Sequence, residues 1–425
     1  MDKAMLPTPS TVRRVSAPGS PAGRVPIVGA ELRQAIRSLA GSDSTLTALS
    51  LTERGVGDGD LRALAEVLAH NRSLVTLDLR CNRIGASGAQ VLAGALAQNV
   101  CLKELSLGDN QIGVGGTQAL VEALAQNRCL ISLDLWRNQI GDSGAQVLGG
   151  ALMRNKYLVR LNLCKNQIGT IGTQALAGAL AQNRCLAELD LSYNQIDSSG
   201  AQALAGALRW NGCLTSLNLG GNQIGTSGMQ GLAGALALNR GLTRLCLWNN
   251  QIDAIGAQAM AWALARNRCL NWLSLKENQI GDGGAQALAN GLAQNSCLKE
   301  LNLGDNEIGD SGAQALATVV ARRHSLSKLV LWHNEIAAGG AQKLAEALMQ
   351  NRCLAELNLS DNQIDDSGAQ ALAKALEDNG CLTRLDLSGN RISAGGAQIS
   401  IDSLLRCNRL AARPEYFAAW RSLRG

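Results

Sequence analysis

The sequence predicts an α/β solenoid in which short strands and helices alternate along a stack of similar repeats. A 28-residue pattern occurs thirteen times between Leu46 and Arg409. Each repeat joins a short segment of alternating apolar residues to a segment with apolar residues at helical spacing. Only 3% of the residues are aromatic although 46% are hydrophobic, so the core must be aliphatic and thin. These features favour one long stack over two or three ordinary domains.

Residues 186–213 show the pattern in full and read LAELDLSYNQIDSSGAQALAGALRWNGC. The general frame is LxxLxLxxNxIxxxGAQALAxALxxNxC, and positions within a repeat are counted from its first Leu. Asn stands at the ninth position in twelve repeats, at intervals of 28 residues from Asn82 to Asn390. Gly stands at the fifteenth position in twelve repeats, from Gly88 to Gly396. Positions this regular indicate architectural roles.

The first part of each repeat, LxxLxL, predicts a strand because its apolar residues alternate. The GAQALAxAL part predicts a helix that begins near the Gly and ends near the second Asn. In the repeat at 186–213 we expect Ala203, Leu204, Ala207 and Leu208 to face the core. A single repeat cannot cover this apolar face, so stacked neighbours must cover it.

The repeats resemble leucine-rich repeats of the ribonuclease-inhibitor type, which also occur in NOD-like receptors and in bacterial type III effectors. The resemblance covers 364 of the 425 residues. It implies a horseshoe with a parallel β-sheet on the concave face and α-helices on the convex face. It also implies that the side chains from Asn82 to Asn390 bond to backbone in the turn after each strand.

The chain outside the repeats predicts three further segments. Residues 1–28 hold five of the six prolines and are expected to form a disordered leader. Residues 29–45 predict an N-terminal helical cap, with Leu32, Ile36 and Leu39 on one face. After the thirteen repeats at 46–409, residues 410–425 are expected to cap the stack. The side chains expected to form this C-terminal cap are Tyr416, Phe417 and Trp420.

The charge and hydropathy limit the classes of partner and compartment. The net charge of +5 comes from the ends, because residues 46–409 carry thirty basic and thirty acidic side chains. The sequence has no dense stripe of basic residues of the kind that indicates a nucleic-acid partner. No apolar run reaches the ~18 residues of a membrane span, and no classical signal peptide is recognisable. We expect a monomer in a cytosol-like compartment, with no metal and no cofactor.

Twelve cysteines are present, and eight of them occupy the last position of a repeat. We expect buried, reduced thiols that pack as small apolar groups. A disulfide between stacked neighbours is the alternative. The chain has no CxxC motif and only three histidines, which argues against a zinc site. The eight cysteines are Cys101, Cys129, Cys185, Cys213, Cys269, Cys297, Cys353 and Cys381.

Basic residues share one position near the predicted helix C-termini. Cations at this position complement the helix dipole and the free carbonyl groups, so a structural role is expected. A basic binding edge is the alternative. The residues are Arg72, Arg128, Lys156, Arg184, Arg240, Arg268 and Arg352.

The third, fifth, seventh and eighth positions of each repeat should point outward on the concave face. They hold thirteen acidic and eight basic residues, so a protein partner with a basic surface is expected. Exposed Trp on such a face indicates binding, although the rings could instead lie against their neighbours. Trp210 and Trp262 fall in the helical halves and are expected to serve packing or the convex surface. The candidate partner-binding residues are Trp136, Tyr193, Trp248, Trp272, Trp332, His333, Glu277, Glu300, Asp305 and Arg244.

The sequence contains no GxSxG, GxxxxGK[ST] or HExxH motif, so an enzyme is not expected. The expected function is a non-catalytic scaffold that binds a protein on its concave face. The GAQALA run resembles repeats of type III effectors, which implies export into a host cell without a classical signal peptide. An organellar transit peptide or a plain tail is the alternative for residues 1–28. The alternative is a GTPase-activating protein or a ubiquitin-ligase adaptor built on the same repeats.

Overall fold

The computed structural model describes residues 28–41, 45–322 and 325–396. The chain divides into two compact parts, the N-terminal module (residues 1–166) and the C-terminal module (residues 167–425). The predicted leader, apart from Val28, lies outside the described residues, as does the predicted cap at 410–425.

The N-terminal module begins with helix α1 (Val28–Ala40) and then alternates strands with helices. Its strands are β1 (Ala48–Ser50), β2 (Thr76–Asp78), β3 (Glu104–Ser106), β4 (Ser132–Asp134) and β5 (Arg160–Asn162). Its other helices are α2 (Asp58–His70), α3 (Ala86–Gln98), α4 (Gly113–Gln126) and α5 (Gly141–Leu152). Each strand pairs in parallel with the next strand of the chain, so the sheet order follows the sequence.

The C-terminal module has the same alternation and the same parallel pairing between consecutive strands. Its helices are α6 (Thr170–Gln182), α7 (Ser198–Leu208), α8 (Gly225–Leu236), α9 (Ala254–Arg266), α10 (Gly281–Leu292), α11 (Asp310–Ala321), α12 (Ala338–Gln350) and α13 (Asp366–Asp378). Its strands are β6 (Glu188–Asp190), β7 (Ser216–Asn218), β8 (Arg244–Cys246), β9 (Trp272–Ser274), β10 (Glu300–Asn302), β11 (Lys328–Val330), β12 (Glu356–Asn358) and β13 (Arg384–Asp386).

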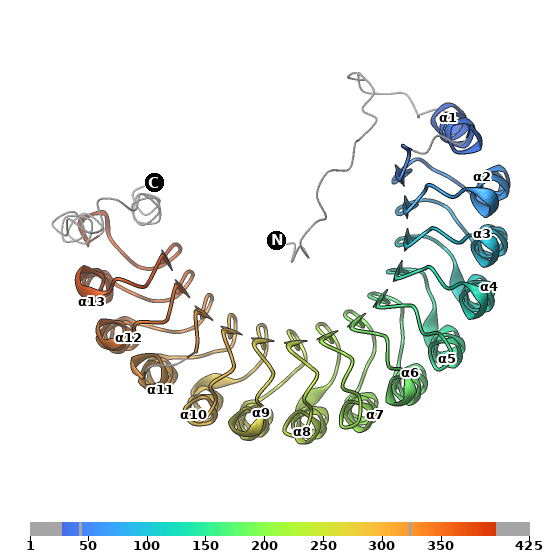
Figure 1. The fold of residues 1–425 in the computed structure, drawn as a ribbon. Coiled ribbons are helices and arrows are strands. Elements are labelled where there is room, and N and C mark those ends of the chain that lie inside the picture. Colours follow the sequence, from blue (N-terminus) through green and yellow to red (C-terminus); the bar gives the residue numbers. More distant parts are fainter. Residues whose placement is uncertain (1–27, 42–44, 323–324, 397–425) are drawn as a thin grey trace. The chain divides into compact units, whose positions relative to one another are not determined.

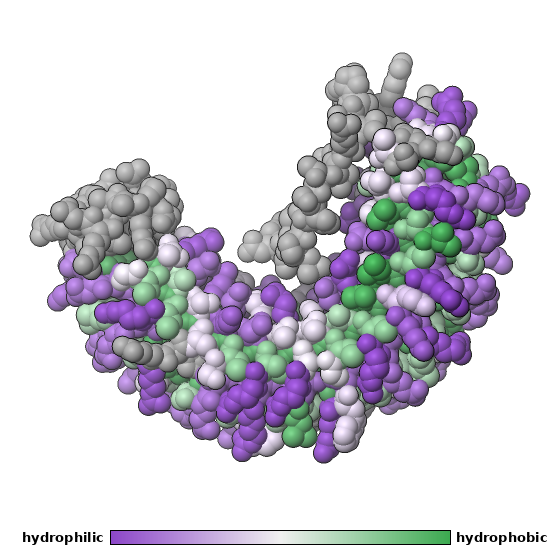
Figure 2. Space-filling view, in the orientation of Figure 1, coloured by the Kyte–Doolittle hydropathy of each residue, from purple (hydrophilic) through white to green (hydrophobic). Residues whose placement is uncertain are grey.

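Within each module the strands line the inner side of the curve and the helices form the outer layer (Figure 1). Figure 2 shows hydrophilic side chains along the outer rim and a more hydrophobic band between the helices and the strands. The predicted α/β solenoid of leucine-rich repeats is therefore confirmed.

The core lies between the two layers and is made of Leu, Ile and Ala from equivalent positions. In β7 and its flanks, Leu214, Leu217 and Leu219 are at most 1% exposed. Burying each such side chain contributes about 1.5–3 kcal/mol. The strand register sets Leu217 beside Leu189 and Leu245, so each leucine packs on its counterparts.

The helical stripe is wider than the sequence predicted, because each helix packs against two neighbouring helices. In α7 the expected Leu204, Ala207 and Leu208 are buried, but Ala203 is half-buried. Ala201 and Ala205 are buried instead.

The Gly at position fifteen allows the start of each helix to approach the preceding repeat closely. A Cβ added at Gly228 would lie 2.7 Å from the Ile224 side chain and 3.0 Å from Ala201 of the preceding helix. Contacts this short would force the neighbouring atoms to move. The regular Gly is therefore explained by packing and not by a turn.

Helix α1 packs against α2 and presents Leu32, Ala35 and Leu39 as buried side chains. Ile36, which the sequence placed on the same face, is half-buried. The Asn71 side chain donates a hydrogen bond to the Leu39 carbonyl, which ties this helix to the first repeat.

The Asn at position nine connects adjacent repeats through its side-chain amide. Asn222 is 5% exposed, and its Nδ2 donates to the carbonyls of Leu191 and Leu219 at 3.1 and 2.8 Å. Its Oδ1 accepts from the Ile196 N–H at 3.0 Å. The expected bonding of these asparagines to turn backbone is confirmed, and the bonds also reach the preceding repeat.

A second buried Asn, at position twenty-six of most repeats, makes an equivalent connection where the helix ends. Asn239 Nδ2 donates to the carbonyls of Leu208 and Asn211 in the preceding repeat, at 2.6 and 2.8 Å. Its Oδ1 accepts from the backbone N–H groups of Gly241 and Leu242. Because buried backbone groups must find partners, this amide fixes the chain reversal after the helix.

Several of the basic residues at the helix C-termini bond to carbonyls, as expected. Arg352 Nη1 donates to the carbonyls of Met349 and Asn351 at 2.9 Å. Arg72 and Arg240 make similar contacts at 3.4 Å.

The cysteines that follow these basic residues are less buried than predicted. The described cysteines are half-buried, or exposed at Cys353, and all of them are free thiols. Several of these thiols donate hydrogen bonds to carbonyls of the preceding repeat, which holds the sulfur atoms at the edge of the core.

Replacement of one of the position-nine asparagines, which together form a ladder of amides along the repeats, should be strongly destabilising. Asn222→Ala leaves two buried carbonyls and one buried N–H without this partner, at about 1–3 kcal/mol each. We expect an unfolding free energy lower by about 3 kcal/mol or more, measured by urea denaturation of the full chain. The adjacent Gln223 is exposed, and Gln223→Ala should change stability by less than about 0.5 kcal/mol. Equal effects of the two substitutions would contradict the ladder's role.

Candidate functional site

The eighth position of every repeat has a left-handed backbone conformation, and four predicted site residues stand there. Tyr193, Glu277, Asp305 and His333 have φ angles of 53°, 56°, 56° and 49°. A non-glycine residue at positive φ is strained by roughly 1–2 kcal/mol. The hydrogen-bonded turn around the position-nine Asn maintains this conformation, so these side chains project from a fixed backbone.

Three of the predicted tryptophans lie over a glycine of the preceding repeat. A Cβ added at Gly220 would overlap the Trp248 indole ring. The same holds for Gly108 beneath Trp136 and for Gly304 beneath Trp332. The rings are half-buried as a result, which agrees with the alternative that they lie against their neighbours.

Trp248 is the centre of an aromatic and cationic group, here called the Trp248 cluster (Tyr193, Trp248 and Lys276). The Tyr193 and Trp248 rings meet edge to face, with centroids 4.7 Å apart and an interplanar angle of 69°. Lys276 Nζ lies 5.2 Å from the Trp248 ring centroid. Tyr193 remains 49% exposed, so the cluster presents an amphipathic surface to solvent.

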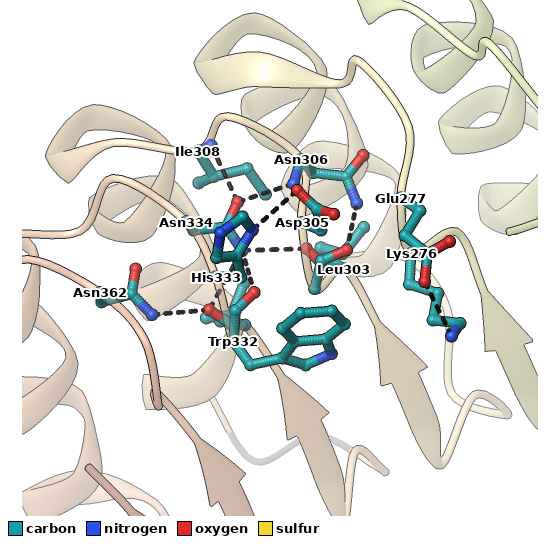
Figure 3. Close-up of polar contacts among 12 residues, drawn as sticks. Lys276, Glu277, Leu303, Asp305, Asn306, Ile308, Trp332, His333, Asn334 and Asn362 are labelled. Carbon is teal, nitrogen blue, oxygen red and sulfur yellow. Dashed lines mark hydrogen bonds and ion pairs between the residues drawn. The ribbon is translucent and has the colours of Figure 1, made fainter. Parts of the chain in front are cut away.

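Further predicted residues form pairs along the same sheet. The Arg244 guanidinium lies 4.6 Å from the Trp272 ring centroid in adjacent strands. His333 Nδ1 is 2.9 Å from Asp305 Oδ1, and the His333 ring lies beside Trp332 with centroids 5.8 Å apart (Figure 3).

The remaining candidates have different surroundings. Glu300 stands on β10 between Trp272 and Lys328 in register and is half-buried. Trp136 belongs to the N-terminal module, so the structure does not place it with the other candidates. The other candidates belong to the C-terminal module, where contacts join Tyr193 to Trp248, Arg244 to Trp272, and His333 to both Asp305 and Trp332.

An open acidic groove lies where strands β8 to β10 end and their turns begin. Glu277 and Asp305 were predicted, whereas Gln251, Gln279 and Glu307 stand at position ten, outside the strand positions that predict the surface. One sequence signal could have identified Glu307, because Glu replaces the usual Gln only there and at Glu335. The groove is lined by Asn249, Gln251, Glu277, Asn278, Gln279, Asp305 and Glu307.

Several acids of the inner face form ion pairs with basic residues of the same face, which leaves the net acidic surplus unchanged. Glu277 contacts Lys276 at 3.0 Å, and Glu356 contacts Lys328 at 2.9 Å. In the N-terminal module, Asp109 contacts Arg137 and Glu104 contacts Arg160, each at 3.0 Å. Exposed pairs of this kind contribute only about 0–1 kcal/mol, so a charged partner can displace them.

The thiol nearest the Trp248 cluster is chemically quiet. Burial raises the pKa of Cys246 to about 12, so the thiolate that would act as a nucleophile is scarce at neutral pH. Among the described residues, no group of three His, Cys, Asp or Glu side chains is placed to hold a metal ion. No helix in the described part of the chain is long and apolar enough to cross a membrane. The surface therefore offers aromatic, cationic and acidic contacts for binding.

This architecture and surface define a repeat protein built for contacts with other proteins. The chain belongs to the leucine-rich repeat family, whose profile, described as Leucine Rich repeat, matches ten segments covering more than half of it. The matched residues are 70–93, 98–121, 126–149, 154–177, 182–205, 211–233, 266–289, 294–317, 350–373 and 378–398. Leucine-rich repeats indicate a protein–protein interaction scaffold.

Among solved structures, the chain is similar to an internalin from Listeria monocytogenes str. 4b F2365. The identity is 21% and the TM-score 0.50, over 86% of this chain and 94% of the internalin chain, which shows a shared fold. Leiomodin-1 actin-binding site 2 matches at 20% identity and a TM-score of 0.32, over 35% of this chain and 87% of that chain. No curated protein gives a significant match.

The pKa of Cys246 leads to a prediction about thiol reactivity. Cys246 should react with iodoacetamide far more slowly than the exposed Cys353, because its thiolate is scarcer at pH 8. Its rate should keep rising about tenfold per pH unit up to pH 10, because that range lies below its pKa. Peptide mass spectrometry of timed samples measures both rates, and equal rates at pH 8 would refute the prediction.

Proposed function

We propose that this scaffold binds a protein partner on the strand face of the C-terminal module, at the Trp248 cluster and the adjoining acidic groove. One observation supports this most strongly. Trp248 is held over Gly220, against Tyr193 and beneath Lys276, while part of its ring remains open to solvent. A pre-ordered aromatic side chain loses little conformational entropy on binding, which is a property of binding hot spots.

The acidic groove defines the chemistry of the partner in this proposal. Glu277, Asp305 and Glu307 line the groove, and Glu277 contacts Lys276 of the cluster, so a partner that offers Lys or Arg beside an apolar side chain complements both features. Glu277 and Asp305 already face Lys276 and His333, which a stronger basic partner would replace. The proposed partner therefore has a basic surface, as the sequence predicted, and this surface contacts the C-terminal module.

The sharpest test compares substitutions on the strand face with one on the helical face. Trp248→Ala should weaken binding of a captured partner by at least about 2 kcal/mol, or roughly thirtyfold. Gly220→Ala should also weaken it, because the new Cβ displaces the ring while the indole remains. Partners are captured with the full chain, identified by mass spectrometry, and their affinities are measured by calorimetry.

Trp210→Ala is the matched control, because it removes an exposed indole from the outer helical layer. It should leave partner affinity unchanged. If Trp248→Ala and Gly220→Ala bind as the wild type does, the strand face is not the binding surface. The triple variant Glu277→Gln, Asp305→Asn and Glu307→Gln separately tests the basic character of the partner.

We further propose that the chain acts inside a host cell after export without a classical signal peptide. The support is the sequence alone, namely a leader of Ser, Pro and Arg in residues 1–28 and effector-like GAQALA repeats. Fusion of residues 1–45 to a reporter should cause its secretion from a strain with a type III system. The control is a strain that lacks the system, and retention in both strains would refute export.

A GTPase-activating or ubiquitin-ligase adaptor role remains the alternative function. Stimulation of GTP hydrolysis by the purified protein would support the GTPase-activating role.

A further inference from the structure

The C-terminal module has a continuous basic edge where helices α6 to α11 end and the chain returns to the next strand. This edge, here called the basic edge, comprises residues 182–187, 209–215, 237–243, 265–271, 293–299 and 321–322. These segments contain seven basic residues and no acidic residue. All seven are exposed, namely Arg184, Arg209, Arg240, Arg266, Arg268, Lys299 and Arg322.

The position-twenty-six asparagines hold this edge in a fixed register. Asn211 donates to the carbonyls of Leu180 and Asn183, and Asn267 does the same to Leu236 and Asn239. These bonds satisfy helix-end carbonyls that would otherwise present partial negative charge. The cations therefore dominate the potential of a rigid edge.

Large hydrophobic side chains protrude among these cations. Trp210 is 72% exposed, Leu238 52% and Trp262 48%. Trp210 and Leu238 occupy position twenty-five of consecutive repeats, just beyond the ends of α7 and α8. The Arg209 and Arg266 guanidinium groups lie 5.6 and 4.4 Å from the centroids of the Trp210 and Trp262 rings.

The opposite edge of the module, where strands lead into helices, has the reverse charge. Between Gln195 and Asp366, positions seven to thirteen of the repeats together contain eleven acidic residues and one lysine. An anionic surface would attract the basic edge and repel this acidic edge, so electrostatics would set the orientation of the whole module.

We propose that the basic edge binds the surface of an anionic lipid membrane. Arginine and lysine provide attraction to acidic headgroups, and indole rings are favoured at the level of the headgroups. The three hydrophobic side chains are separated by helix spacings, so Trp210 and Trp262 span roughly 16–20 Å. A fluid lipid surface accepts such separated protrusions, whereas an acidic protein would need a matching hole for each. Arg209 and Arg266 also cover part of the Trp210 and Trp262 rings, on which nucleic-acid bases would stack, which argues against a nucleic-acid partner.

The test is co-sedimentation of the full chain with vesicles at physiological salt. Vesicles of 30% phosphatidylserine in phosphatidylcholine should bind the wild type, and pure phosphatidylcholine should bind it weakly. The variant Arg209→Gln, Arg240→Gln, Arg266→Gln should lower the partition coefficient by about a hundredfold, at roughly fivefold per cation. The variant Trp210→Ala, Leu238→Ala, Trp262→Ala should also lower it and should remove the fluorescence quenching by brominated lipid that the wild type shows.

The control variant is Lys343→Gln, Lys374→Gln, Arg384→Gln, which removes the same charge from elsewhere in the C-terminal module. It should bind vesicles as the wild type does, and circular dichroism checks that all variants are folded. Equal binding of the wild type and the Arg209 triple variant would overturn the proposal, because other cations would then be responsible. Failure to bind phosphatidylserine vesicles would also overturn it, and charge-dependent binding to duplex DNA or polyglutamate would then assign the edge to a soluble polyanion.

Discussion

Two series of buried asparagine amides, at positions nine and twenty-six of most repeats, are the interactions on which the rest of this structure depends. Thin aliphatic layers give cohesion, but leucine contacts alone do not fix how one layer sits on the next. The amide of Asn222 contacts backbone in its own repeat and in the preceding one, and the amide of Asn239 does the same at the helix end. A shifted neighbour would leave these buried groups unpaired, so the two ladders convert cohesion into a unique register.

The display of side chains on the inner face is a consequence of that register. The turn that follows each strand leaves the eighth residue at positive φ in every repeat, whichever side chain is present. Gly occurs there only at Gly221 and Gly389, so the fold accepts strain at most repeats. Tyr193 and His333 thereby occupy equivalent, fixed positions, and differences between repeats become differences in surface chemistry alone.

The fold followed from the sequence because its cause is periodic, whereas the site depends on pairs of residues in neighbouring repeats. Position nine was predicted from the regular series, and its partners are backbone groups present in every repeat. The half-burial of Trp248 depends on Gly220, which lies 28 residues earlier and has no regular counterpart. The Gly–Trp pairs at one position of consecutive repeats were visible in the sequence, but their meaning required the distance between the two strands. Glu307 was missed because position ten belongs to the turn, and alternation of strand side chains does not extend there.

The opposite charges of the two edges have a common physical origin in the parallel helices. Asp197 and Asp253 accept from the N–H groups of Gly200 and Gly256 at the start of their own helices, and these bonds lower the pKa of both carboxyls. Asp282 and Asp310, one position later, accept instead from helix starts of the following repeat.

Those aspartates complement the positive helix ends, as Arg240 and Arg352 complement the negative ends. Charges that satisfy helix ends are therefore accounted for by the fold. Others stand outside this scheme: Glu277 and Glu307 line an open groove, and Arg209 lies against an exposed indole. The helix ends do not require these charges, so the architecture of the repeats does not explain their positions.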